Sequence, residues 1–302
     1  MRTLKDLWMI LRHDPAAMTG FVIVCLYIIM AVAGPFVPVT HNENPLLAYE
    51  PPSFRHLLGT DYAGRDTLSE IVNGSTPVLI VAVIASAFSV IVGVIIGLSA
   101  GILRGIGDTI LMRLADIFLT IPSLPLVIVL VTFIHSSSPF VLAMLISITG
   151  WAGLARSIRS QALSLSKRDF VESASVQGLS FWNILSRQLL PNMGSYVAMS
   201  FLLGITGAIY AEVGLYLLGI APFTASNWGV MLNFAINQAG AIYTSQSLLY
   251  LLSPMFAIVI LQIGFVLFTR ALDQLFNPRI RTGWSTKKTS TKNMTRGEGA
   301  SL

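Results

Sequence analysis

The sequence predicts an all-α, polytopic membrane protein with six transmembrane helices. Three observations support this fold class: 54% of the 302 residues are hydrophobic, only 11% are charged, and uncharged stretches long enough to cross a bilayer recur along the chain. A soluble domain carries about 25% charged residues. The low charge content therefore excludes a mainly soluble enzyme.

A spanning helix needs about 20 apolar residues, because the hydrocarbon core is about 30 Å thick and a helix rises 1.5 Å per residue. Six spans are expected: one in 16–39, one in 77–103, two in 117–155, one in 194–219 and one in 248–269. The turn HSSSP separates the third span from the fourth, and Pro122 and Pro125 predict a kink in the third. The uncharged link 220–247 favours an interfacial or re-entrant element over a seventh span.

Positive charges predict the orientation, because cytoplasmic loops retain Lys and Arg. With the N-terminus inside, 17 of the 19 basic residues fall on the cytoplasmic side, and we expect both termini there in a multi-pass protein of the cell membrane. The excess of basic over acidic residues is then explained by the membrane topology and by contact with anionic headgroups. No nucleic-acid surface is expected. Ala31 to Ala33 have the spacing of a signal-peptide cleavage site, but the Gly-Pro that follows disfavours cleavage.

These spans divide the chain into three parts. Residues 1–76 hold an N-terminal cytoplasmic segment, the first span and an external loop. Residues 77–281 form a core with five spans, and 282–302 read as a disordered cytoplasmic tail rich in Ser, Thr, Lys and Gly.

Motifs for catalysis or metal binding are missing from the sequence. There is no Gly-Lys pair for a phosphate-binding loop and no HExxH helix, and the one cysteine lies within a span. Energy for transport would have to come from an ion gradient or from a partner. Glu212 is the only acid that interrupts a span, and its reading stays open between a local hydrogen bond and a place on a translocation path.

Glycines at 93, 97, 101 and 105 are spaced four apart on the second span. Such a stripe lets another backbone approach closely. Packing within the bundle is favoured over a homodimer seam.

The segment 168–192 between the fourth and fifth spans is too polar to cross the membrane and predicts a helical hairpin. Asp169 and Glu172 resemble a capping box, Gly178 can end the first helix in the left-handed conformation, and Pro191 is expected to end the second. An apolar face with no core of its own is expected from Phe170, Val171, Ala174, Leu179, Phe181 and Trp182. This face could lie on lipid headgroups or enter a groove of a soluble partner.

Several motifs in the chain are also those of a known family. The run Glu172, Ala174, Gly178 and Leu190-Pro191-Asn192 resembles the EAA loop of permease subunits in binding-protein-dependent ABC importers. HLLGTDYAGRDTLS, at 56–69, resembles the external loop of the C-type subunit in the peptide, oligosaccharide and nickel permease family. Similar segments are LRHDPAAMTGFVIV, GWAGLARSIRSQALSLSKRDFVE, AEVGLYLLG and NPRIR. Ser173 is a small departure from the family pattern that should leave docking intact. Gln188, Glu70 and Thr76 also depart from the pattern, so contacts there are not carried over.

The resemblance implies a type I importer permease fold and a non-catalytic subunit that works by alternating access. It implies a heterodimer with a second related permease, two ATPase subunits that bind the ATP and Mg, and an extracytoplasmic solute-binding protein. This chain would bind no cofactor. Peptides are the default cargo, with oligosaccharides as the main alternative and nickel complexes also handled by relatives. An ion-coupled secondary carrier is the alternative function.

The resemblance also assigns roles to residues. Coupling to the ATPase is expected from Asp169, Glu172, Ala174, Gly178, Leu190 and Pro191. Contact between the external loop and the binding protein is expected from Gly59, Thr60, Asp61, Gly64, Arg65 and Asp66.

Overall fold

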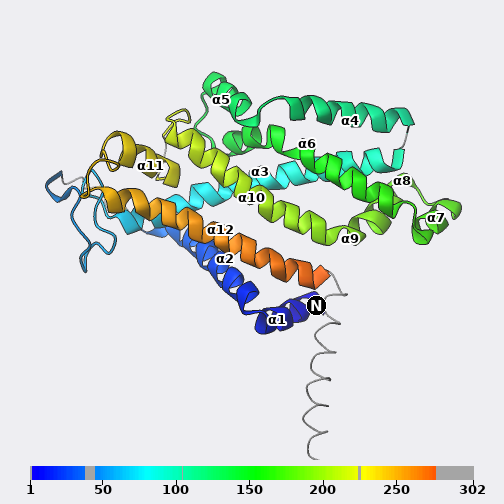
Figure 1. Cartoon of the computed structure of the whole chain (residues 1–302), viewed down its shortest axis with the longest axis horizontal. Coiled ribbons are helices and arrows are strands. Elements are labelled where there is room, and N and C mark those ends of the chain that lie inside the picture. Colours follow the sequence, from blue (N-terminus) through cyan, green and yellow to red (C-terminus); the bar gives the residue numbers. More distant parts are fainter. Residues whose placement is uncertain (1, 38–44, 104, 224–225, 277–302) are drawn as a thin grey trace, which may run out of the picture.

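The computed structural model describes residues 2–37, 45–103, 105–223 and 226–276 (Figure 1). The NPRIR segment and the predicted tail 282–302 lie outside these ranges. Within them every regular element is a helix, and one isolated antiparallel bridge joins Thr60 to Asp66. The all-α prediction is confirmed.

The helices follow one another along the chain with short connections. Their bounds are α1 Arg2–His13, α2 Pro15–Ala33, η1 Gly34–Phe36, η2 Pro45–Leu47, α3 Thr67–Leu103, α4 Gly105–Thr120, α5 Ser123–Ile134, α6 Pro139–Leu165, α7 Asp169–Val176, α8 Phe181–Asn183, the π-helix η3 Ile184–Leu189, α9 Leu190–Asn192, α10 Gly194–Leu217, α11 Trp228–Asn237 and α12 Leu248–Phe276.

Five helices are long and apolar enough to cross a membrane: α2 with η1, α3, α6, α10 and α12. The bent pair α4 and α5 brings the total to six if it counts as one span. The kink predicted in the third span is a full break, because α4 ends at Thr120, α5 begins at Ser123, and the two helices meet at an angle of 82°. Pro122 causes this break, since proline donates no hydrogen bond and drives the preceding residue out of helical conformation. Pro125 lies in the first turn of α5, where it causes no kink.

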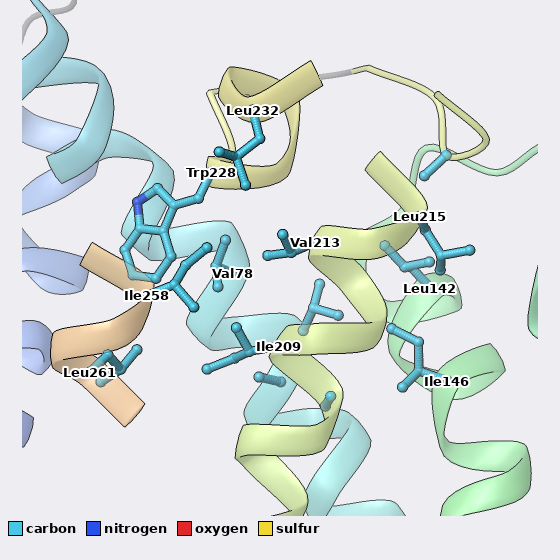
Figure 2. Close-up of a cluster of buried hydrophobic side chains, with 14 of the residues drawn as sticks. Val78, Leu142, Ile146, Ile209, Val213, Leu215, Trp228, Leu232, Ile258 and Leu261 are labelled. Atoms are coloured by element: carbon cyan, nitrogen blue, oxygen red, sulfur yellow. The ribbon is translucent and has the colours of Figure 1, made fainter. Parts of the chain in front are cut away.

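The long helices form an elongated bundle (Figure 1). Helix α3 packs along α6 and α10, and α2 packs along α12. The loop that precedes α3 and the helix α11 lie together at one end, which we call the loop end, and α7 and α8 lie at the opposite hairpin end (Figure 1). A core of buried side chains from α3, α10, α11 and α12 holds the loop end together, with Trp228 beside Val78 and Ile258 (Figure 2).

Three of the four glycines in the stripe lie on α3 and pack against α6, as packing within the bundle predicts, whereas Gly105 begins α4 with a φ of 63°. A Cβ at Gly97 would lie 2.5 Å from the carbonyl oxygen of Ala155, and a Cβ at Gly101 would lie 2.6 Å from the Cβ of Ala162. Gly93 approaches the carbonyl of Trp151 in the same way. Only glycine permits this backbone distance, so the stripe sets how closely α3 and α6 approach.

The link 220–247 contains one helix, α11, of ten residues. Ten residues rise about 15 Å, half the thickness of the hydrocarbon core. Helix α11 packs on α10, α12 and α3, and most of its side chains are buried. This geometry agrees with a re-entrant element and not with a seventh span.

Candidate functional site

The hairpin between α6 and α10 has the turn that its sequence predicts. Gly178 has a φ of 72°, and the N–H of Leu179 donates to the carbonyl of Ala174 at 3.2 Å. This six-to-one bond is the Schellman arrangement that ends a helix at a left-handed glycine. Ser180 then stands at the N-cap of α8. Asp169 is the first residue of α7, one position later than a capping box requires.

The hairpin is not without a core, which corrects the expectation of a wholly unpartnered apolar face. Val171 and Ala174 are buried and join a cluster with Leu98 of α3 and Ile158 of α6. The opposite side keeps large apolar groups in the open, and Trp182 is 63% exposed. The other exposed members are Phe170, Val176 and Leu179. One face of the hairpin therefore anchors it to the bundle, and the other is free for a partner.

Pro191 does not end the helix that precedes it, contrary to expectation. It lies in the first turn of α9, and the chain continues through Met193 into α10. The residues before it, Ile184–Leu189, form a π-helix. Because a proline ring clashes with the carbonyl four residues earlier and offers no N–H, the wider turn accommodates it. Leu190 closes this turn, since its N–H donates to the carbonyl of Leu185.

At the loop end, Asp61 organises the segment GTDYAGRD. Its side chain is 0% exposed, and Oδ1 accepts from the N–H groups of Ala63 at 2.9 Å and Arg65 at 2.7 Å. Gly59 and Gly64 have φ values of 75° and 78°, which few other residues adopt. The segment is thus a compact turn closed around one carboxylate, and we call it the GTD turn.

Arg65 connects this turn to α3. Its Nη2 lies 2.7 Å from Oδ2 of Asp61 and 3.1 Å from Oε1 of Glu70, and its guanidinium stacks on Tyr62 at 5.2 Å. Burial disfavours the charge of Arg65, but the carboxylates of Glu70 and Asp61 outweigh burial and raise the pKa of the guanidinium above its ordinary value. Arg65 is therefore a permanent cation within the turn.

Asp66 caps α3. Its Oδ2 accepts from the N–H of Ser69 at 2.8 Å and from the Ser69 hydroxyl at 2.7 Å, while Oδ1 lies 3.1 Å from Nδ1 of His56. Thr60 is buried as well, and its N–H donates to the carbonyl of Glu50. The predicted contact residues thus hold the loop in shape, with Thr60 and Asp61 turned inward. Contact with a binding protein stays a prediction for the loop as a whole.

Glu212 is fully buried within α10. Its Oε1 accepts from Nδ2 of Asn227 at 2.8 Å, and Oδ1 of Asn227 accepts from the N–H of Gly229 at 2.8 Å. Glu212 therefore orients the residue that caps α11, which supports the hydrogen-bond interpretation. A place on the translocation path stays a prediction.

Two ion pairs between α4 and α6 were not foreseen. Arg159 pairs with Asp108, and Arg156 pairs with Asp116. Both arginines follow the expected fourth span, which ends at residue 155, whereas α6 continues to Leu165 and carries them. Their spacing of three residues, which puts them on one helix face, was the available signal.

A family model described as binding-protein-dependent transport system inner membrane component matches residues 93–282. The chain belongs to this family. A second model, the N-terminal TM domain of oligopeptide transport permease C, matches residues 3–52.

Curated relatives cover most of this permease. It is 33% identical over 234 residues to the dipeptide transport system permease protein DppC of Bacillus subtilis, covering 76% of this chain and 72% of the relative. It is 33% identical to the oligopeptide transport system permease protein OppC of the same organism, covering 75% of each chain. It is 30% identical over 279 residues to the probable D,D-dipeptide transport system permease protein DdpC of Escherichia coli, covering 91% of each. The resemblance inferred from the sequence motifs is confirmed.

Proposed function

We propose that this chain is one of two permease subunits in an ATP-driven importer of peptides. It would form half of the translocation pathway beside a second related permease, with two ATPase subunits on the cytoplasmic side and a solute-binding protein on the other. The family match over 93–282 carries the importer assignment. The names of the relatives, which are dipeptide and oligopeptide permeases, favour peptides over oligosaccharides.

The hairpin is the proposed contact with the ATPase. It presents exposed apolar side chains at one end of the bundle, and its other face is anchored in the core shared by α3 and α6. A movement of the hairpin would therefore reach the spans directly. ATP and Mg would bind to the ATPase subunits, and this chain would supply no catalytic group.

The two ends of the bundle also fit a single orientation in the membrane. The basic segments predict the hairpin end and both chain termini in the cytoplasm, and the loop end outside. The GTD turn and the hairpin lie at opposite ends of the molecule (Figure 1), as an external and a cytoplasmic partner would require.

Affinity purification of the chain from its native membrane, followed by mass spectrometry, tests the assembly. We expect a second permease and ATPases with a phosphate-binding Gly-Lys-Ser/Thr motif. Recovery of the chain alone, together with uptake driven by an ion gradient without ATPase, would favour a secondary carrier instead.

Cargo is tested separately on the purified binding protein. A panel of peptides and oligosaccharides is titrated, and saturable binding of peptides alone is the expected result. Binding of oligosaccharides alone would overturn the cargo assignment and leave the importer assignment in place.

A further inference from the structure

A polar pocket lies at the loop end between the GTD turn, α11 and α12. Its volume is about 130 Å³, and its lining includes Arg65, Glu70, Asn227, Phe223, Phe234 and Tyr250. A water molecule needs roughly 10–15 Å³ of such space. The pocket therefore has room for a group larger than one water.

Two buried polar atoms in this lining have no hydrogen-bond partner within the described ranges. They are Oε2 of Glu70, in a residue that is 3% exposed, and the hydroxyl of Tyr250, in a residue that is 2% exposed. A buried polar atom left without a partner costs about 1–3 kcal/mol. Both atoms can accept a hydrogen bond. A donor placed in the pocket would therefore satisfy both atoms.

The charge balance points in the same direction. Arg65 is the one guanidinium in the lining, and its Nε and Nη2 are directed at Asp61, with Nη2 also 3.1 Å from Oε1 of Glu70. One guanidinium therefore faces two carboxyl groups, so ionisation of both would leave one negative charge without a counter-ion.

Aromatic rings form the remaining walls. Phe223 and Phe234 meet edge to face with centroids 5.4 Å apart, and Phe223 is 45% exposed, so the pocket reaches the surface beside it. Ring faces attract cations, and an ammonium group combines a positive charge with N–H donors. A hydrated metal ion is less suited, since no group of three or more His, Cys, Asp or Glu capable of holding a metal occurs among the residues described.

We propose that this pocket binds a protonated amine, with Oε2 of Glu70 and the hydroxyl of Tyr250 as hydrogen-bond acceptors. The amine would supply donors to both atoms and a counter-charge to an ionised Glu70. Its source is either the α-ammonium group of a peptide cargo or a free alkylammonium ion. The first source rests on the proposed function, and the pocket itself does not.

Thermal unfolding of the full chain in detergent tests the site without transport. The probe is methylammonium chloride at constant ionic strength, with sodium chloride as the reference salt. We expect a saturable rise in the melting temperature of about 5 °C at a hundredfold excess over Kd. Glu70→Gln and Tyr250→Phe should each lose this rise, and Glu50→Gln, a carboxyl change on the same loop but outside the pocket, should retain it.

Equal protection by sodium and methylammonium would overturn the amine assignment, as would an unchanged response in both pocket variants. Tyr250→Phe keeps the test valid if Glu70→Gln fails to fold, because the substitution removes a single oxygen. A dipeptide with a free amino terminus is then compared with its N-acetylated form. Protection by the free dipeptide alone would identify cargo as the source. Protection by methylammonium without any effect of the dipeptide would retain the site and exclude that source.

Discussion

The indole Nε1–H of Trp228 donates a hydrogen bond to the carbonyl of Ile71 at 3.0 Å, which connects α11 to α3 across 157 residues of sequence. The same indole meets the ring of Tyr27 edge-on at 5.9 Å, and the hydroxyl of Tyr27 donates to the carbonyl of Ala257. Four helices, α2, α3, α11 and α12, therefore converge on one fully buried side chain.

Trp228→Ala should lower the free energy of unfolding by about 3–5 kcal/mol, because it leaves a large cavity where these helices meet. Thermal unfolding of the purified chain measures the loss. Trp182→Ala is the matched control, since Trp182 is exposed on the hairpin and should leave the melting temperature unchanged. Equal destabilisation by the two substitutions would contradict the central position of Trp228.

Gly97→Ala should destabilise the bundle, because the added Cβ meets the backbone of α6 at 2.5 Å. Gly207→Ala on α10 meets no atom within 4 Å and should stabilise by about 0.5–1 kcal/mol through helix propensity. The opposite signs of the two changes in melting temperature are the expected result. A neutral Gly97→Ala would show that α3 and α6 can separate at no cost.

Gly178→Val should uncouple transport from ATP hydrolysis. A side chain in the left-handed conformation costs about 1–2 kcal/mol, which is about tenfold in the population of the native turn. Uptake and cargo-stimulated ATPase activity in proteoliposomes are compared with insertion and stability. Gly240→Val carries the same strain at a φ of 57°, equally free of neighbours, near the loop end, and should leave coupling intact. Wild-type uptake by the Gly178 variant would remove the hairpin from the mechanism.

Glu212→Gln should preserve both stability and uptake, because the amide oxygen can still accept from Asn227. Glu212→Leu leaves that amide buried without an acceptor, at a cost of about 1–3 kcal/mol. Melting temperature and uptake are measured for both variants. Loss of uptake in a correctly folded Gln variant would place the carboxyl group on the translocation path.

Span positions and the hairpin turn could be predicted from sequence, because each depends on local properties. Hydrophobic length determines the spans, and Gly178 is required wherever the chain must turn with positive φ. The direction of the bend at Pro122 could not be predicted, since it depends on which face of α4 packs on α6.

The interior role of Asp61 could not be predicted either. A charged residue in a polar loop reads as a surface group, and only the folded turn reveals that its carboxylate accepts two backbone N–H groups. The bond from Gln274 to Asp14, which connects α12 to the start of α2, spans 260 residues and has no local sequence pattern. Such pairs depend on how each helix is rotated about its own axis, and no linear motif encodes this rotation.

Helix α3 has 37 residues and is about 55 Å long, well beyond the roughly 30 Å of hydrocarbon. Asp66 and the turn that begins at Gly59 lie at its N-terminal end. Its C-terminal part packs against α6 and against the buried side chains of the hairpin. The helix is thus long enough to extend past both faces of the hydrocarbon core. A tilt imposed at its hairpin end would displace its loop end in the opposite direction, so one helix connects the two surfaces proposed for the partners.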